Sequence, residues 1–264
     1  MNKILVVAKN PETYFIKRLI DEVGNDRVVL YNPWKDPAPM GFTQILFRSS
    51  GVYHSDVDLA FARTLNTPIM NPLSSLETFR SKSSQYRFFA QEGHPSLPWW
   101  WLEKWSAVES IQQYLVKPDR GQGGWGIEVL SARELLSWRE RQLSKGDASW
   151  IVQPFVQAPE YRVFFMGEER FTLKRTPNPN HLVANFAQEG EAELVTMPEP
   201  MRATVERLIR ASGAFYGAID LLETPAGPQF LELNVVPGIE QLEKITGLNI
   251  MKLFLTANYF CQIG

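Results

Sequence analysis

Short apolar segments and longer amphipathic segments alternate through the first 78 residues of the chain. Residues 13–24 and 55–65 repeat apolar positions at helical spacing, and the first of these segments ends at Gly24. The remaining apolar segments have the length and composition of buried strands, and they are residues 3–9, 27–32, 43–49 and 67–72. Because strands that alternate with helices form parallel sheets with helices on their faces, we expect an α/β domain over residues 1–78.

A second pattern begins after residue 78 and continues to residue 155. Its amphipathic and apolar segments predict helices at residues 81–93, 106–114 and 131–146, and strands at residues 97–104 and 149–155. The strand at 97–104 is unusually rich in tryptophan, which favours hydrophobic packing.

From residue 156 onward, pairs of strands dominate. Residues 160–175 have the pattern of a hairpin that turns at residues 166–168. Residues 216–222 and 229–235 predict a second hairpin around a loop rich in proline and glycine. Residues 177–194 are expected to form a loop, and helices are expected at residues 199–213, 239–247 and 249–263.

The composition is that of an ordinary soluble globular protein. The chain has 264 residues, of which 44% are hydrophobic and 21% charged, and its formal net charge of -2 gives no footprint for nucleic acid or an anionic membrane. The single cysteine, Cys261, rules out an internal disulfide and fits a reducing compartment. The N-terminus has the pattern of a strand and not of a signal peptide, and no segment approaches the roughly 20 apolar residues that cross a bilayer. We therefore expect a cytoplasmic protein.

Acidic residues face one another in the second hairpin. Glu232 and Asn234 share one face of their strand because side chains alternate along a strand. In an antiparallel register centred on the loop, Asp220 lies opposite or nearly opposite Glu232. Directly opposed like charges destabilise a sheet, and a bound cation reverses the sign of that interaction. Since Mg²⁺ takes carboxylate and amide oxygens, Asp220, Glu232 and Asn234 are candidate metal ligands. A hairpin with one solvated face gives the same pattern.

Glycines fill the loop that follows residue 117. Gly121, Gly123, Gly124 and Gly126 include the spacing G-x-G-x-x-G, but a dinucleotide site requires these glycines to open a helix. Here they lead into residues 127–130, which have strand character, so the loop is expected to join two strands. Such a loop can fold its backbone N–H groups over nucleotide phosphates. Lys117, in the preceding strand, is expected to face those phosphates; the alternative is an edge-strand lysine in water.

Basic residues are grouped in the first hairpin. Arg162, Lys174 and Arg175 could face a common anion, although an ordinary charged hairpin face looks the same. Arg48 follows the strand at residues 44–47, and ligands of open α/β sheets bind outside the carboxyl ends of strands. Arg48 is therefore a candidate for contact with an anionic substrate group, with a solvated loop arginine as the alternative.

The order of these parts resembles the ATP-grasp ligases, and within them the RimK-like amino-acid ligases. The resemblance runs from about Arg48 to Ile250, and its most specific portion is YGAIDLLETPAGPQFLELNVVPGIEQLEKITGLNI. It implies a Rossmann-like (pre-ATP-grasp) α/β domain followed by a two-lobed α+β ATP-grasp fold. The implied boundaries are 1–78 for the first domain and 79–264 for the second, with a central lobe at 79–155 and a C-terminal lobe at 156–264.

The resemblance also implies roles for individual residues. Lys82 and Lys117 correspond to the lysines that contact ATP phosphates, beneath the glycine flap, and Arg162 to the arginine that neutralises the transferred phosphoryl group. Glu160 resembles the acidic ribose contact. Either Lys174 or Arg175 fills the next basic position, and Asn185 is a further candidate catalytic residue. The segment that meets adenine through backbone groups corresponds to Gln153, Pro154, Phe155 and Val156. Asp220, Glu232 and Asn234 correspond to the ligands of two Mg²⁺ ions, for which Mn²⁺ is an alternative.

The implied chemistry is ATP-dependent ligation of a carboxylate to an amine through an acyl phosphate. The expected partners are an amino acid and an acceptor that is a small molecule, a peptide or a protein tail. The oligomeric state stays open, a homo-oligomer being one option. Alternatives are an ATP-grasp ligase of the dipeptide or glutathione-synthetase kind, a small-molecule kinase, and a nucleotide-binding module without turnover.

Overall fold

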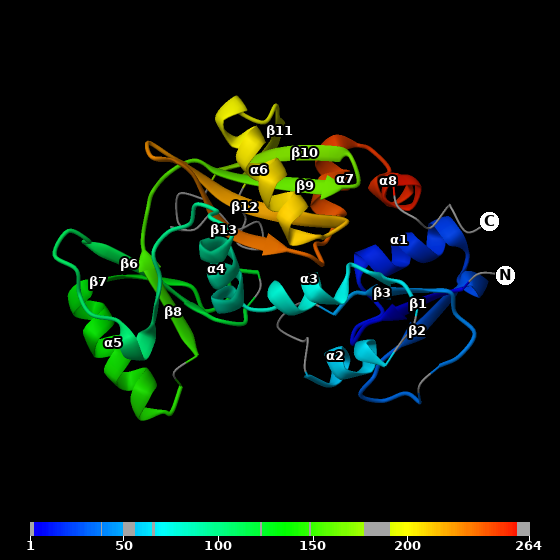
Figure 1. Ribbon diagram of the computed structural model, residues 1–264, viewed down its shortest axis with the longest axis horizontal. Helices are drawn as coiled ribbons and strands as arrows, with labels where there is room; N and C mark the ends of the chain where they lie inside the picture. The colour runs from blue at the N-terminus through cyan, green and yellow to red at the C-terminus, as the bar shows by residue number, and fades with distance from the viewer. Residues whose placement is uncertain are drawn as a thin grey trace.

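The computed structural model describes residues 3–37, 39–49, 56–64, 67–121, 123–147, 149–176 and 191–257. They form three sheets (Figure 1). The N-terminal sheet has the order β2-β1-β3-β4 and is entirely parallel. Its strands are β1 (Ile4–Val7), β2 (Val28–Tyr31), β3 (Gln44–Phe47) and β4 (Ile69–Met70). The predicted parallel arrangement is confirmed.

Helices cover both faces of the N-terminal sheet because successive strand residues point to opposite sides. On one face, Val6 and Leu46 pack with Phe15 of α1 (Tyr14–Val23). On the other, Val7 and Phe47 share a core with residues of α2 (Asp56–Arg63) and α3 (Leu73–Thr78). A short 3-10 helix, Asn25–Arg27, leads from α1 into β2.

The second sheet is antiparallel, with the order β5-β8-β6-β7, and lies to the left in Figure 1. Its strands are β5 (Trp100–Trp101), β6 (Gln113–Pro118), β7 (Glu128–Ser131) and β8 (Trp150–Pro154). Helix α5 (Ala132–Ser144) packs against it over a separate core and begins with a capping box between Ser131 and Glu134.

Two predictions for this region were wrong. The helix expected at residues 106–114 does not form, because Gln113 and Tyr114 already belong to β6. The buried Tyr114 packs edge-on against Trp105 and its hydroxyl accepts a hydrogen bond from the Val108 backbone N–H. Tertiary packing therefore overrides the local periodicity. The strand expected at residues 97–104 is reduced to β5, since Leu102–Lys104 forms a 3-10 helix.

The third sheet is antiparallel and has the order β11-β10-β9-β12-β13. Its strands are β9 (Glu160–Met166), β10 (Glu169–Thr176), β11 (Glu191–Val195), β12 (Tyr216–Thr224) and β13 (Gly227–Asn234). Helix α6 (Glu199–Ser212) shares a core with one face, while α7 (Glu240–Thr246) and α8 (Ile250–Ala257) pack with the other. Both predicted hairpins are confirmed. Strand β11 was not predicted, because its residues belong to a stretch with the composition of a loop.

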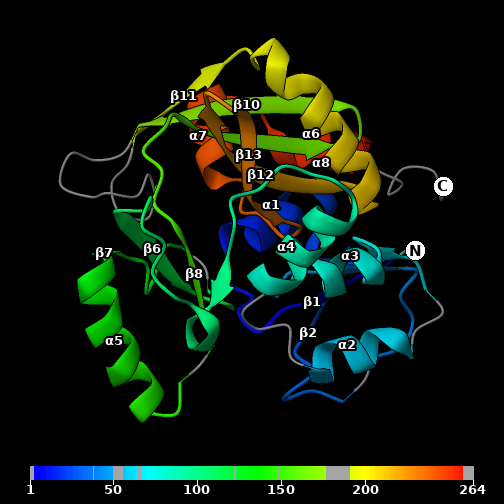
Figure 2. The same ribbon diagram turned by 60° about the vertical axis from the view of Figure 1, so that its left-hand side comes forward.

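Helix α4 (Lys82–Gln91) lies between the second and third sheets in both views (Figures 1 and 2). Ser81 caps it by accepting a hydrogen bond from the Ser84 backbone N–H. The helix also covers the open edge of β13: the Leu233 N–H donates to Gln85 Oε1 at 2.8 Å. Tyr86 links both sheets, since its hydroxyl lies 3.0 Å from the Leu231 carbonyl oxygen and 3.1 Å from Gln153 Oε1.

Among the described residues, none of the helices is long and apolar enough to span a membrane.

Candidate active site

The acidic hairpin has the register that the sequence predicts. Asp220 of β12 lies opposite Glu232 of β13, and Ala218 lies opposite Asn234. The register shifts by a β-bulge immediately after Asp220. Because paired residues on adjacent strands point to the same side, Asp220, Glu232 and Asn234 share one face of the third sheet.

Arg162 of β9 lies opposite Asp220 on its other side. The guanidinium and the carboxylate form a two-pronged ion pair, with 2.6 Å from Nε to Oδ1 and 2.5 Å from Nη2 to Oδ2. Arg175 of β10 continues the cluster: its Nη1 lies 2.8 Å from Glu160 Oε1 and 3.7 Å from Asp220 Oδ1. Positive and negative side chains therefore alternate across three neighbouring strands.

Burial and pairing compete in setting the ionisation of this cluster. Burial alone favours the neutral carboxyl group of Asp220, but attraction to Arg162 and Arg175 outweighs it and holds the pKa of Asp220 below its usual value. For Glu160, burial dominates, and with repulsion from Asp220 it raises the pKa to about 7 despite Arg175. The cluster thus contains one carboxylate that stays ionised at neutral pH and one that titrates near it.

Two buried lysines approach this cluster from other elements. Lys82, the first residue of α4, is 6% exposed and its Nζ donates to the Gly121 carbonyl oxygen at 3.0 Å. Lys117 of β6 is equally buried, with its Nζ 5.3 Å from the ring centroid of Tyr86. Burial, and then repulsion from Lys82, lower the pKa of Lys117 to about 7, against the attraction of Glu232. Lys117 has no hydrogen bond or ion pair with any described residue.

The glycine loop joins two antiparallel strands, β6 and β7, as predicted. Gly123, Gly124 and Gly126 have φ values of 65°, 74° and 75°. These left-handed conformations explain why the segment requires glycine. Trp125, between them, is 79% exposed. The bond from Lys82 to Gly121 places the start of the loop above the lysine pair.

The predicted adenine-contact segment lies at the end of β8 and beyond it. Gln153 is fully buried, and its side-chain oxygen lies beside the Tyr86 hydroxyl. Pro154 ends the strand, and the backbone N–H of Phe155 donates to the Gln113 carbonyl oxygen at 2.9 Å. The segment then continues through the half-buried Val156 toward β9. Its contact with a nucleotide stays a prediction.

Of the remaining predicted site residues of the C-terminal lobe, Lys174 does not join the cluster. Lys174 lies opposite Tyr161 and Glu193, so it points to the face away from Arg175 and does not join the charged cluster. Of the two alternatives, Arg175 is the residue that reaches Asp220. Asn185 lies outside the described residues.

Arg48 follows β3 as predicted, and its guanidinium group contacts other groups of the protein. Its Nη1 donates to the Tyr216 hydroxyl at 3.3 Å and its Nη2 to the Pro237 carbonyl oxygen at 3.0 Å. The guanidinium carbon lies 3.7 Å from the ring centroid of Phe15. These contacts anchor Arg48 between the N-terminal sheet and the third sheet, and its contact with a substrate anion stays a prediction.

The donor set at the acidic hairpin fits Mg²⁺ in its chemistry. Asp220 and Glu232 bring two carboxylates to one face, and Asn234 adds a neutral amide oxygen. Within the described ranges there is no group of three or more histidine, cysteine, aspartate or glutamate side chains suited to a metal. An ion here would therefore take its remaining ligands from water or phosphate, as Mg²⁺ commonly does.

Sequence reasoning missed the groups that hold these residues in place. Tyr86, whose ring lies next to Lys117, has the sequence pattern of an ordinary helix position. Asn71 lies just after β4, and its one distinguishing feature in the sequence is that it is a polar residue at the carboxyl end of a parallel strand. That feature could have identified Asn71.

The arrangement of sheets and helices is that of the ATP-grasp enzymes. The chain is similar to the RimK-domain ATP-grasp protein of Sphaerobacter thermophilus, with a TM-score of 0.77, 18% identity, and coverage of 97% of this chain and 99% of that one. It is also similar to the ATP-grasp ligase PsnB in complex with a variant of its minimal precursor, Mg and ADP, with a TM-score of 0.69, 18% identity, and coverage of 97% and 98%.

A family model described as the RimK-like ATP-grasp domain matches residues 106–257, more than half of the chain. The chain belongs to the RimK-like ATP-grasp family, and it is a ligase by class. A curated relative, a probable alpha-L-glutamate ligase of Legionella pneumophila (strain Corby), is 23% identical over 278 aligned residues, which cover 94% of this chain and 92% of the relative.

Proposed function

We propose that this protein uses ATP and Mg²⁺ to join a carboxylate to an amine through an acyl phosphate, adding an amino acid to a small-molecule, peptide or protein acceptor. The observation that supports the proposal is Lys117, a buried amine that has no hydrogen bond or ion pair with any described residue and lies close enough to Asp220 and Glu232 to be attracted by both. A buried cation of this kind is stabilised by an anion that arrives from solution.

In this proposal Lys82 and Lys117 hold the phosphates of ATP beneath the glycine loop. An oxygen of the donor carboxylate attacks the γ-phosphorus, and ADP leaves. The amine then attacks the acyl carbon, phosphate leaves, and the amine nitrogen loses a proton. Arg162 and Arg175 lie where they can neutralise the charge that develops on the transferred group. Mg²⁺, held by Asp220, Glu232 and Asn234, would supply further neutralisation of phosphate charge.

The name of the Legionella relative makes glutamate the first amino acid to test, both as the activated carboxylate and as the attacking amine. The experiment measures ADP release with ATP, Mg²⁺ and individual amino acids, with and without hydroxylamine. An acyl phosphate reacts with hydroxylamine to give a hydroxamate, whereas a phosphate ester does not. Formation of a hydroxamate supports the ligase, and a stable phosphorylated hydroxyl product would instead identify a kinase.

A further inference from the structure

The segment that follows the proposed metal ligand Asn234 is held by the N-terminal sheet. Asn71, after β4, is completely buried and uses both ends of its side-chain amide. Its Nδ2 donates to the carbonyl oxygens of Tyr216 and Val235, each at 2.8 Å. Its Oδ1 accepts from the backbone N–H groups of Phe215 and Tyr216, at 2.7 and 3.2 Å. One side chain thus ties the start of β12 to the end of β13.

Arg48 adds a second connection two residues further on. Its Nη2 reaches the carbonyl oxygen of Pro237, and its ring contact with Phe15 fixes the guanidinium against α1. Asn234 itself forms a local turn with the chain that follows, since its Oδ1 accepts a hydrogen bond from the Val236 backbone N–H at 2.9 Å.

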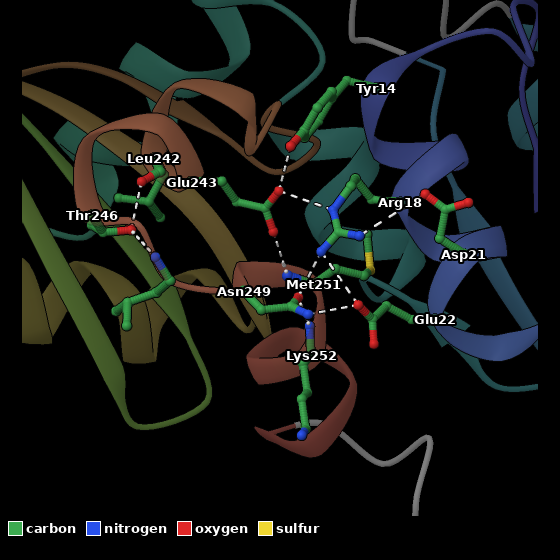
Figure 3. Close-up of polar contacts among 11 residues, drawn as sticks. Tyr14, Arg18, Asp21, Glu22, Leu242, Glu243, Thr246, Asn249, Met251 and Lys252 are labelled. Carbon is green, nitrogen blue, oxygen red and sulfur yellow. Dashed lines mark hydrogen bonds and ion pairs between the residues drawn. The ribbon is translucent and has the colours of Figure 1, made fainter.

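Glu243 of α7 makes the third connection, and it is the centre of a polar network (Figure 3). Its Oε2 accepts from the Tyr14 hydroxyl at 2.5 Å and from Arg18 Nε at 3.1 Å, both on α1. Its Oε1 accepts from the Met251 backbone N–H, at the start of α8, at 3.1 Å. The carboxylate therefore joins three helices, α1, α7 and α8, downstream of the acidic hairpin.

Arg18 extends this network to the surface. Its Nη2 donates to Asn249 Oδ1 at 2.9 Å and to Glu22 Oε1 at 3.3 Å, and the Asn249 amide in turn donates to Glu22 at 2.6 Å (Figure 3). Because the guanidinium is fixed by several acceptors, little conformational freedom remains to be lost when it bonds to Glu243.

We propose that Glu243 is a positioning residue for metal binding, through which α1 of the N-terminal domain holds the segment after β13 and so fixes Asn234. The inference rests on the proposed function. Its physical basis is that Asn234 is the last residue of β13, so its position depends on the chain that follows, which Asn71 and Arg48 hold at residues 235 and 237 and Glu243 holds in α7. Groups that orient a metal ligand typically change metal affinity by roughly 10- to 100-fold when they are removed.

The test is calorimetric titration of ADP into the full-length protein, in Mg²⁺ and again in EDTA. Glu243→Gln keeps the size of the side chain and removes its charge, and Tyr14→Phe removes one donor from the N-terminal side. The matched control is Glu240→Gln in the same helix, where Glu240 forms an exposed ion pair with Lys244. We expect ADP affinity in Mg²⁺ to fall about tenfold for Glu243→Gln, with a smaller loss for Tyr14→Phe. Affinity in EDTA, which depends on Lys82 and Lys117, should stay within about twofold of the parent.

Hydrogen exchange of the amides at residues 234–239 gives a second readout, and faster exchange is expected in Glu243→Gln but not in Glu240→Gln. Parent-like ADP affinity in Mg²⁺ for a folded Glu243→Gln would overturn the inference. An equal loss with and without Mg²⁺ would also overturn it, since that result indicates general disruption. If the parent itself fails to bind ADP in Mg²⁺, the proposed function fails, and this inference fails with it.

Discussion

The buried amine of Lys117 links nucleotide binding to the uptake of a proton. Burial and the nearby Lys82 lower the pKa of Lys117 to about 7, so at pH 8 about nine in ten free molecules carry the neutral amine. A phosphate bound beside Lys117 favours the charged form and raises that pKa. Binding of ADP above neutral pH must therefore protonate the amine, which costs about 1.4 kcal/mol at pH 8 and about 2.7 kcal/mol at pH 9.

The corresponding measurement is ADP affinity between pH 7 and pH 9. It should fall by about tenfold for each pH unit above 7, until the pKa of the complex is reached. Calorimetry in buffers of different ionisation enthalpy should show uptake approaching one proton per ADP. Lys117→Met should weaken binding at pH 7 and remove both the pH dependence and the proton uptake that the parent shows. Lys104→Met, at an exposed position, is the matched control and should behave like the parent.

The stability of the free protein should also depend on the ionisation of Lys117. The pKa of Lys117 in the folded protein lies below the ordinary lysine value of 10.5, so between about pH 7 and pH 10.5 the unfolded chain binds more protons. Stability should then rise with pH from about 7 to about 10, relative to Lys117→Met. Equal ADP affinity at pH 7 and pH 9, or undiminished proton uptake in Lys117→Met, would refute the reasoning.

Four further substitutions test the site and the core. Glu232→Gln removes one of the two opposed carboxylates and should abolish ADP release while circular dichroism stays unchanged; release at the parent rate would contradict the metal assignment. Gly217→Ala would place Cβ 2.7 Å from the Phe165 ring, so urea unfolding should show a loss of about 1–3 kcal/mol. Gly238→Ala meets nothing within 4 Å and should leave the unfolding midpoint close to that of the parent; equal losses in the two variants would argue against the steric cause. The ring nitrogens of the buried His94 have no hydrogen-bond partner among the described residues, and burial lowers the pKa of His94, so its contribution to stability is present above pH 6.5 and is lost as the pH falls. His94→Phe should therefore lose less melting temperature than the parent between pH 7 and pH 5, and parallel curves would contradict this.

The acidic hairpin could be predicted in detail because two regular features define it. A turn-rich loop sets the centre of the hairpin, and the two-residue period of strands then brings Asp220 to within one residue of Glu232. The β-bulge between Leu221 and Asp220 lies between the turn and this pair and shifts the register by the one residue that sets Asp220 directly opposite Glu232, which the sequence pattern does not specify. The parallel N-terminal sheet was predictable for a similar reason, since the alternation of strands and helices specifies it.

The choice between Lys174 and Arg175 depends on the length of the turn, which the sequence left open. A turn of residues 166–168 would pair Phe165 with Glu169 and put Lys174 on the face of Arg162, whereas the structure pairs Met166 with Glu169 and places Arg162 opposite Leu173. Arg175, two residues beyond Leu173, then shares the face of Arg162, and Lys174 does not. The helix wrongly expected at residues 106–114 differs from this case. Its outcome depends on packing between Trp105 and Tyr114, which local periodicity does not contain.

Arg48 shows that the location of a residue can be predicted where its contacts within the protein cannot. The rule that ligands bind at the carboxyl ends of parallel strands placed it well, and the third sheet lies at that edge. Its acceptors, the Tyr216 hydroxyl and the Pro237 carbonyl oxygen, come from residues far along the chain, so no local pattern identifies them.

The ion pair between Arg162 and Asp220 places a positive charge of the protein itself beside the opposed carboxylates of the acidic hairpin. Two acidic side chains face each other across β12 and β13, and a cation is needed to make that arrangement stable. Sequence reasoning assigned the cation to bound metal, whereas the folded chain supplies Arg162 from the neighbouring strand. The same carboxylate of Asp220 is thus both the partner of Arg162 and a proposed metal ligand. Mg²⁺ would compete with the guanidinium for these oxygens, and an arginine released in this way becomes available to the phosphoryl group. In the proposed function, the arginine that offsets one of the two opposed carboxylates in the ligand-free hairpin would therefore also serve the phosphoryl group once metal and nucleotide bind.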